Sequence, residues 1–450
     1  MKLAALILTL FVFTAIGQTS DAALRRITEA DRASRDASGK LPVGSAAEHL
    51  SKAETYMANR LFPQAREHWA IVMREYPADA GIPKALFGTG RSYMWEREYG
   101  KAVEWFDKLT KDYLMTKDGR EGLNFKGASY VRMNKHMEAV KAYEQYTVMF
   151  PQGERIESAH LNIIDALREA GRYDDANKWV ATTAVKFAGK PTEINALHAR
   201  LRMEIFRENW KGAIAAADVL LAERSFAGSM ATSDEVKYLK AFAQSKTGGS
   251  NAFSAITPSA SSYFSGLAAD RARGSNVKLI SSVTPRYYSD YPVMFQAALV
   301  REAKKRNVDP RFMLAIMKQE SSFRPNAKSP AGARGLLQFV YDTAIKYKDA
   351  AGYRNLQPDD LYNPSINIAL GAEYIRFLKD EFGGLYEGIA ASYNAGEDNA
   401  LRWLNRSKPK DPGIFTAEVG FAETKNYVYK VMTNYRIYRE LYDENLNRRQ

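Results

Sequence analysis

The sequence predicts an all-α protein in two parts, an N-terminal superhelix of helical repeats followed by a C-terminal helical domain. Small residues recur at a fixed interval of 37 through the first half of the chain. In the second half, an apolar stripe with helical spacing ends in the carboxylic acid of Glu320. A segment rich in serine and glycine separates the halves, and 450 residues suffice for two or more domains.

The first residues have the pattern of a secretory signal peptide. Lys2 is followed by an apolar stretch from Leu3 to Gly17 and then by small residues, so we expect cleavage after Gly17 or after Ala23. The apolar run is shorter than the about 18 residues of a membrane-spanning helix. No cysteine follows that would carry a lipid anchor. We assign residues 1–23 to a signal peptide and expect a periplasmic or otherwise exported envelope protein without a stable membrane anchor.

Charge and cysteine content restrict the partners. A chain without cysteine has no risk of mispairing in an oxidising compartment. The net charge of +12 favours an anionic partner, and the stem peptides of peptidoglycan supply carboxylates. Nucleic acid is the competing anion, and the export signal argues against it. The histidines show no metal-ligand spacing, and we expect neither a metal nor an organic cofactor. They are His49, His68, His136, His160 and His198.

Residues 46–245 are predicted to form the repeats. The recurring small residues are Ala65, Ala102, Ala139, Ala176 and Ala213. An aromatic residue or a histidine stands three positions before each of them. This helix–turn–helix pattern resembles tetratricopeptide repeats, slightly lengthened. Such helix pairs bury their apolar faces by stacking into a superhelix. We interpret the repeat aromatics as packing residues. The array would bind a partner protein, bind a glycan or peptide strand, or hold the second domain at the cell wall, and the sequence does not choose among these.

Residues 246–284 differ from both neighbours in composition. Glycine, serine and proline punctuate them, which is typical of a linker. Phe253, Tyr263 and Phe264 are large apolar residues that favour docking onto a folded part. We therefore assign a linker or docking segment. We also expect a chain that lacks residues 24–245 to fold.

A helix carries the principal candidate for chemistry. Asp309 supplies an N-cap, Pro310 suits the first helical position, and Pro325 prevents continuation. One side of this helix, at i, i+3, i+4 spacing, carries Phe312, Met313, Ile316, Met317 and Glu320. A carboxyl at the end of an apolar face is partly desolvated, which raises its pKa and suits it to be the general acid of a glycosidase. The alternative is a solvated glutamate at a helix end.

The segment after this helix favours a ligand site. Pro330, Gly332 and Gly335 allow tight turns and close approach of the backbone. Ser329 and Gln338 supply neutral donors and acceptors suited to hydroxyl and amide groups.

Four motifs in this order resemble the lytic transglycosylase (SLT) domain family. They are Gln319-Glu320-Ser321, Ser329-Pro330-Ala331-Gly332-Ala333-Arg334-Gly335-Leu336-Leu337-Gln338, Ala391-Ser392-Tyr393-Asn394-Ala395-Gly396 and Phe421-Ala422-Glu423-Thr424-Lys425-Asn426-Tyr427-Val428. Asn363-Pro364, Asn367 and Gly371 match an intermediate helix start. The resemblance implies a small, mostly helical, lysozyme-like (goose-type) fold, which we assign to residues 285–450.

The resemblance also implies a reaction. Family members cleave the β-1,4 bond between N-acetylmuramic acid and N-acetylglucosamine in peptidoglycan, and the muramyl O6 closes onto C1 to leave a 1,6-anhydro end. Glu320 would first protonate the glycosidic oxygen and then accept the proton of the O6 hydroxyl. The N-acetyl oxygen of the substrate would stabilise the developing cation at C1, an exception to the two-carboxylate rule.

The remaining site residues are carried over by position. Ser329 and Tyr393 match positions near the reacting sugar, and Gln338, Asn394 and Tyr427 match positions that bind substrate or shape the cleft. Core packing is an alternative for Tyr427. We assign Glu423 a supporting role, as a carboxylate that hydrogen-bonds the loop carrying the catalytic helix.

Some residues depart from the family pattern. Leu337 stands where methionine is usual, and the usual Met-Pro is replaced by residues 339–342, which makes Asp342 a candidate N-cap of the next helix. Asp342 is also the next acidic residue after Glu320, so the sequence suits a mechanism with one carboxylate. One rival is a hydrolytic muramidase on the same fold, which for inversion needs a second carboxylate about 6.5–9.5 Å away. The other is a non-catalytic scaffold that binds peptidoglycan. The sequence leaves open endolytic or exolytic action and any need for stem peptides.

Overall fold

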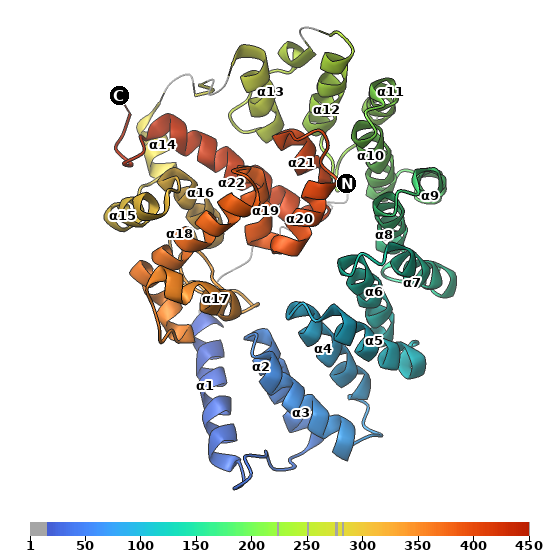
Figure 1. The fold of residues 1–450 in the computed structure, drawn as a ribbon, viewed down its shortest axis with the longest axis vertical. Helices are drawn as coiled ribbons and strands as arrows, with labels where there is room; N and C mark the ends of the chain where they lie inside the picture. Colours follow the sequence, from blue (N-terminus) through green and yellow to red (C-terminus); the bar gives the residue numbers. More distant parts are fainter. Residues whose placement is uncertain (1–15, 223–224, 250–251, 275–277, 281–282, 450) are drawn as a thin grey trace, which may run out of the picture.

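The chain folds as an arc of helices that curves around a second helical domain (Figure 1). This computed structural model describes residues 16–222, 225–249, 252–274, 278–280 and 283–449. In these ranges the regular elements are helices, and β-structure is limited to isolated bridges. The predicted all-α class is confirmed.

The arc consists of stacked helix pairs, coloured blue to green in Figure 1. In each pair an A helix precedes a B helix. The pairs are α2 (Ala46–Ala58) with α3 (Phe62–Glu75), α4 (Ile82–Trp95) with α5 (Tyr99–Tyr113), α6 (Lys117–Arg132) with α7 (His136–Met149), α8 (Ile156–Glu169) with α9 (Tyr173–Lys186), and α10 (Pro191–Phe206) with α11 (Trp210–Leu221). The A helix α12 (Ser233–Lys246) follows, and α1 (Ile16–Ser34) precedes the first pair.

The 37-residue period is a structural repeat. The B helices begin 37 residues apart, at Phe62, Tyr99, His136, Tyr173 and Trp210. The alanine three residues into each B helix is fully buried, as the sequence predicts for a close helix contact. The turn between the A and B helices also repeats, because the residue two positions before each B helix has a positive φ. These residues are Arg60, Arg97, Asn134, Gly171 and Glu208.

Residues 246–284 dock onto both neighbouring parts. They contain the 3₁₀ helix η1 (Ala252–Ala255) and α13 (Tyr263–Arg273). Tyr263 and Phe264 are buried, and the Tyr263 hydroxyl donates to the carboxylate of Glu387 at 3.0 Å. The apolar cluster around Tyr263 includes Tyr238 of the repeats and Ile414 of the second domain. A single core thus crosses the expected boundary, which argues against independent folding of a chain that lacks residues 24–245.

The second domain has its own helical core. Its helices are α14 (Pro285–Asp290), α15 (Gln296–Arg306), α16 (Pro310–Ser321), α17 (Tyr341–Ala351), η2 (Pro358–Tyr362), α18 (Pro364–Glu381), α19 (Tyr386–Ala395), α20 (Glu397–Asn405), α21 (Pro412–Glu418) and α22 (Ala422–Leu441). Helices α16 and α19 both pack against the long α22. Residues 310–317 of α16 are all buried, so this helix lies inside the core rather than on its surface.

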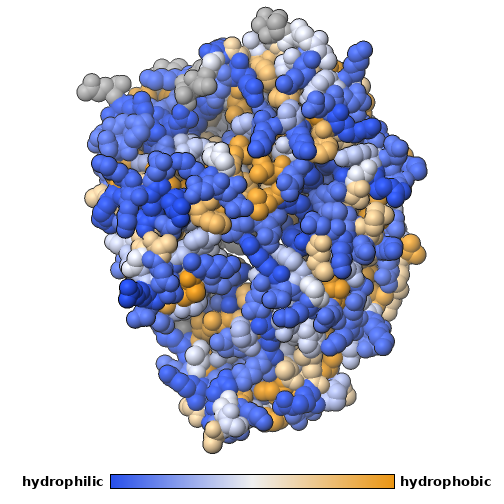
Figure 2. Space-filling model, viewed as in Figure 1, coloured by the Kyte–Doolittle hydropathy of each residue, from blue (hydrophilic) through white to orange (hydrophobic). Residues whose placement is uncertain are grey.

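Buried ion pairs join the inner rim of the arc to the second domain. Arg168 and Arg202 of the repeats each reach the carboxylate of Glu418 at 2.8 Å. Burial alone would raise the pKa of Glu418, but these guanidinium groups lower the pKa to about 2. Lys425 of α22 pairs in the same way with Glu235 of α12 at 2.7 Å. The face of the molecule seen in Figure 2 is mostly hydrophilic, and apolar residues form separate groups on it.

The expected signal peptide lies largely outside the described residues, which begin at Ile16. The buried Leu24 and Asp31 of α1 follow both expected cleavage sites, so cleavage there would leave the docked part of α1 in place. Among the described residues, no helix combines the length and apolar character needed to cross a membrane.

Candidate active site

Glu320 occupies the last turn of α16. As predicted, Asp309 caps the start of this helix, and its side chain accepts the backbone N–H of Arg311. The helix ends at Ser321 because Ser322 and Phe323 both adopt left-handed backbone conformations, with φ of 50° and 64°. Such conformations are uncommon for residues other than glycine and turn the chain sharply. The carboxyl of Glu320 is therefore held at the junction between a rigid helix and a loop.

Two tyrosines from other helices lie near Glu320. The Tyr427 hydroxyl of α22 donates to Oε1 of Glu320 at 2.6 Å. Burial, with a contribution from the nearby Glu320 charge, raises the pKa of both Tyr427 and Tyr393 of α19 well above 10. Both hydroxyls therefore remain protonated donors at neutral pH. Tyr427 is also buried in the core, so the packing role weighed for it from the sequence and the contact with Glu320 coexist.

The surroundings of Glu320 favour the protonated form of its carboxyl. Burial raises the pKa of Glu320 from 4.5 to about 7, the hydrogen bond from Tyr427 opposes this rise, and the negative charge of Glu423 adds to it. Desolvation is the dominant cause because it penalises only the ionised form. Near neutral pH the carboxyl holds a proton in a large fraction of molecules, which a general acid requires.

The loop between α16 and α17, residues 322–340, is here called the Ser329 loop. Its backbone folds back on itself in tight turns and forms isolated antiparallel β-bridges between Lys328 and Arg334 and between Arg334 and Phe339. The Ser329 hydroxyl oxygen accepts the N–H of Ala333 at 3.1 Å. Gln338 has a φ of 49°, and its amide nitrogen donates to loop carbonyls at 3.0 and 2.8 Å. Ser329 and Gln338 thus hold the loop. Within the described part of the chain, no hydrogen bond engages the Ser329 hydroxyl hydrogen or the Gln338 Oε1, so both groups can meet a ligand.

Two contacts fix the Ser329 loop against the helices that carry the tyrosines and Glu320. The Tyr393 hydroxyl donates to the carbonyl of Leu337 at 2.8 Å. The buried Ser321 hydroxyl, next to Glu320, donates to the carbonyl of Leu336 at 2.7 Å. Any displacement of this loop would therefore act directly on the neighbours of Glu320.

Asn367 is a supporting residue whose role the sequence did not reveal. Its fully buried side chain accepts the Leu337 N–H at 2.8 Å and donates to the carbonyls of Arg334 and Leu361 at 3.0 and 2.7 Å. Gly335 lies so close to it that a Cβ atom there would stand 2.4 Å from the Asn367 amide nitrogen. The motif match placed Asn367 at a helix start, but residue type alone does not show which backbone groups an amide satisfies.

Asn394 lies near the end of α19, and Glu423 lies in the first turn of α22. Asn394 accepts a hydrogen bond from Thr424 at 2.6 Å, which ties the end of α19 to the first turn of α22. Glu423 is exposed in that first turn and influences Glu320 through its charge. The hydrogen bond expected from Glu423 to the Ser329 loop is not among the contacts of the described residues. Asp342 is not the N-cap of α17, which is Val340; it lies in the first turn and binds Arg60.

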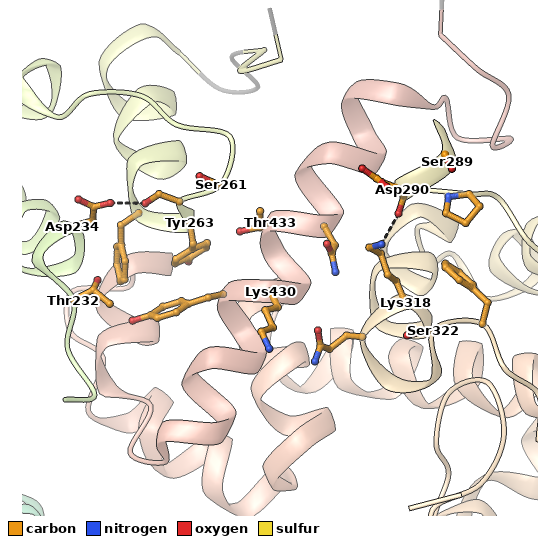
Figure 3. Close-up of a pocket in the computed structure, with 17 residues that line it drawn as sticks. Thr232, Asp234, Ser261, Tyr263, Ser289, Asp290, Lys318, Ser322, Lys430 and Thr433 are labelled. Atoms are coloured by element: carbon orange, nitrogen blue, oxygen red, sulfur yellow. Dashed lines mark hydrogen bonds between the residues drawn. The ribbon is translucent and has the colours of Figure 1, made fainter. Parts of the chain in front are cut away.

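A cavity of about 710 Å³ opens beside the end of α16 (Figure 3). Lys318 and Ser322 line it from the end of α16, Lys430 and Thr433 from α22, and Tyr263 from α13. Lys318 is held in place by the carbonyl of Asp290, to which it donates at 2.5 Å. Hydroxyl, ammonium and aromatic groups of this kind suit a polar ligand with flat apolar faces. Glu320, Tyr393 and Tyr427 do not line the cavity, which adjoins Glu320 through Gln319 without containing it.

Comparisons with known proteins agree with this arrangement. Residues 298–415 match the Transglycosylase SLT domain, and residues 50–113 and 126–191 match the Tetratricopeptide repeat. The chain thus carries an SLT domain preceded by tetratricopeptide repeats, and the family resemblance seen in the motifs is confirmed.

Particular relatives match about a third of this chain. The soluble lytic murein transglycosylase of Salmonella typhimurium is 31% identical over 153 residues, which are 33% of this chain and 23% of that protein. The putative soluble lytic murein transglycosylase of Haemophilus influenzae is 36% identical over 149 residues, 33% of this chain and 24% of that protein. The membrane-bound lytic murein transglycosylase C of Cronobacter sakazakii is 29% identical over 194 residues, 38% of this chain and 54% of that protein. The chain thus spans about a quarter of the length of the first two of these relatives.

Among solved structures, the 70 kDa soluble lytic transglycosylase of Escherichia coli aligns with 96% of this chain and 86% of its own, at 17% identity and a TM-score of 0.48.

Proposed function

We propose that this protein is a peptidoglycan lytic transglycosylase with Glu320 as its general acid and then its base. The observation that carries the proposal is the position of the Glu320 carboxyl, which is half-buried, has a raised pKa and is held by Tyr427 beside the Ser329 loop. The SLT domain match and the names of the relatives support the same reaction.

The geometry suits proton transfer in both directions. Tyr427 occupies Oε1 of Glu320, which leaves Oε2 to hold the transferable proton. Glu320 donates this proton to the glycosidic oxygen as the bond from that oxygen to C1 of the muramyl residue breaks. The carboxylate that results, still stabilised by Tyr427, accepts the proton of the O6 hydroxyl as O6 bonds to C1. The acid is thereby regenerated, and no water is consumed.

The neighbours of Glu320 are proposed to bind the amides and hydroxyls of the sugars. The Ser329 hydroxyl hydrogen, the Gln338 Oε1 and the Asn394 Nδ2 supply two donors and one acceptor around the acid. Tyr393 is proposed to keep the carbonyl of Leu337 turned toward the helix and to border the reacting sugar.

A hydrolytic muramidase is the second candidate, and Glu423 is the observation that favours it. The sequence showed no carboxylate close behind Glu320, but the fold brings Glu423 near enough for its charge to raise the pKa of Glu320. An exposed carboxylate in this position would suit a base that activates water. The two candidates differ in their products, because hydrolysis adds one water molecule and transglycosylation does not.

We further propose that the protein acts in the cell envelope, where its substrate lies. The expected signal peptide and the murein-acting relatives support this location. The repeats remain a candidate surface for a protein partner. Their inner rim is engaged by the second domain, so a partner would bind the outer face.

Mass spectrometry of the products from purified peptidoglycan tests the proposal, with Glu320→Gln and Glu387→Gln beside the wild type. Glu387 is a matched control, because burial also raises its pKa to about 7 and a tyrosine also donates to it. It belongs to α19, and its carboxyl contacts Tyr263 of α13 rather than the Ser329 loop. Anhydro ends from wild type and Glu387→Gln, and none from Glu320→Gln, are expected. Reducing ends would establish the muramidase, and anhydro products from Glu320→Gln would refute the role of Glu320.

A further inference from the structure

We propose that the first repeat completes the active site, with Asn59 and Arg60 as positioning residues that hold the Ser329 loop from another domain. The inference rests on the proposed function for its catalytic consequence. The structural part stands on contacts between the turn after α2 and the loop.

Asn59 is a buried point of contact between the two domains. Its Oδ1 accepts hydrogen bonds from Lys328 Nζ at 3.1 Å and from Arg334 Nη2 at 3.2 Å. Its amide nitrogen donates to the carbonyl of Thr55 at 2.8 Å, which fixes the orientation of the side chain. Hydrogen bonds from cationic donors are stronger than neutral ones, and here they are shielded from solvent. Both cations belong to the loop on either side of Ser329.

The loop backbone also packs directly on the end of α2. Gly332 has a φ of 76°, and a Cβ atom there would stand 2.9 Å from the carbonyl oxygen of Ala58. Arg334 closes this turn, because its Nη1 donates to the carbonyl of Gly332 at 2.7 Å. Backbone of the repeat and backbone of the loop are thus in contact without an intervening side chain.

Arg60 holds the far end of the loop. It forms a two-pronged pair with Asp342 in the first turn of α17, with both N–O distances at 2.7 Å. The loop is therefore tied to the first repeat at Asn59 and again where α17 begins. Between these ties lie Leu336 and Leu337, whose carbonyls bind Ser321 and Tyr393. The position of the repeat is in this way transmitted to the groups around Glu320.

The repeat fold itself does not require these residues. The positions equivalent to Asn59 in the later repeats, at intervals of 37, hold Glu96, Met133, Ala170 and Arg207. All of them end their A helices, so the turn forms without asparagine. The position equivalent to Arg60 in the fifth repeat holds Glu208 in the same left-handed conformation. Asn59→Ala and Arg60→Glu therefore introduce residues that the same turn already carries elsewhere in this chain.

Hydrogen exchange of the full-length protein, measured by mass spectrometry, tests the positioning directly, and cleavage of peptidoglycan tests its consequence. Asn59→Ala and Arg60→Glu are expected to speed exchange in residues 322–340 about tenfold, and to lower kcat/KM by a similar factor, with exchange in α16 and α22 unchanged. Arg60→Glu with Asp342→Arg restores the pair in reverse and is expected to recover both. Arg25→Ala is the control, because it breaks an exposed pair with Asp359 that does not touch the loop.

The proposal is overturned if the loop exchanges as slowly in Asn59→Ala and Arg60→Glu as in the wild type. It is equally overturned if exchange rises throughout the second domain, since that pattern reports general destabilisation, or if the reversed pair recovers nothing. A wild type that cleaves no peptidoglycan would refute the proposed function instead, and loop exchange would still decide the positioning role.

Discussion

Glu320→Gln is expected to stabilise the protein at alkaline pH while abolishing its proposed activity. Burial holds the pKa of Glu320 at about 7 in the folded chain, against 4.5 for the ordinary carboxyl. Below about pH 4.5 the carboxyl is protonated in both the folded and unfolded states and has no effect. As the pH rises toward 7 only the unfolded state ionises readily, so the folded state loses relative stability, and above about pH 7 the full penalty applies.

The magnitude follows from the two pKa values. Each pKa unit corresponds to about 1.4 kcal/mol, so the difference between 4.5 and about 7 amounts to about 3 kcal/mol. Glutamine has nearly the same shape and no charge, and its oxygen still accepts from Tyr427. Glu320→Gln should therefore match the wild type near pH 4.5 and exceed its free energy of unfolding by about 3 kcal/mol near pH 8.

Urea denaturation, followed by circular dichroism across this pH range, measures the difference. Glu387→Gln is again the matched control, because the pKa of Glu387 is raised to about 7 by burial as well. The free energy of unfolding of both variants should increase relative to that of the wild type as the pH rises, and only Glu320→Gln should lose activity. A Glu320→Gln protein whose advantage does not grow with pH would show that the carboxyl is well solvated, and the argument for a protonated acid would fail. If Glu387→Gln behaved as expected in the same experiment, the failure would be specific to the site.

Four further outcomes are expected. Cleavage should fall as pH rises through about 7, because the acid must be protonated. Glu423→Gln should move this fall to lower pH, because it removes a charge that raises the pKa of Glu320. An unchanged pH profile would show that the charge of Glu423 does not act on Glu320. Tyr393→Phe should lower kcat about tenfold through loss of its bond to Leu337, with little change in Tm, whereas loss of folding would make it a packing residue. Asn367→Ala should lower the free energy of unfolding by about 3 kcal/mol, as measured by urea titration, because it leaves three buried backbone groups unsatisfied. A much smaller loss would contradict the supporting role of Asn367. A chain without residues 24–245 should aggregate; a soluble, cooperative fragment would show that the shared core is dispensable.

Local periodicity made much of the fold predictable. The alanines at intervals of 37 located the B helices, because a small residue is needed wherever two helices pack closely. The cap at Asp309 and the apolar stripe behind it located Glu320 at the end of a buried helix. Both signals depend on residues within one or two helical turns, where sequence spacing translates directly into spatial arrangement.

The contacts that complete the site join residues far apart in the chain. Asn59 and Lys328 are 269 residues apart, and Tyr427 and Glu320 are 107 apart. Nothing in the residue types marks them as neighbours. The first pair meets only because the arc curves back to the second domain, and the second pair meets because α16 packs against α22. The left-handed turn residues were also hidden, because Arg60 and Glu208 are residue types that seldom adopt that conformation. Glu423 was assigned a hydrogen bond on the basis of resemblance, and its exposed position could be known only from the packing of α22.

The charges at the domain interface favour one role for the repeats over the others. Glu418 and Lys425 are buried in the second domain, and the repeats supply Arg168, Arg202 and Glu235 as their partners. Leaving a buried charge without its partner costs about 3–5 kcal/mol. Losing these partners would remove a substantial part of the stability of a domain, which is normally about 5–15 kcal/mol. The inner rim of the arc therefore binds the second domain. If a partner protein were to bind this rim instead, these ion pairs would have to break. These contacts favour a role for the repeats in holding the second domain in place and, through Asn59, the Ser329 loop.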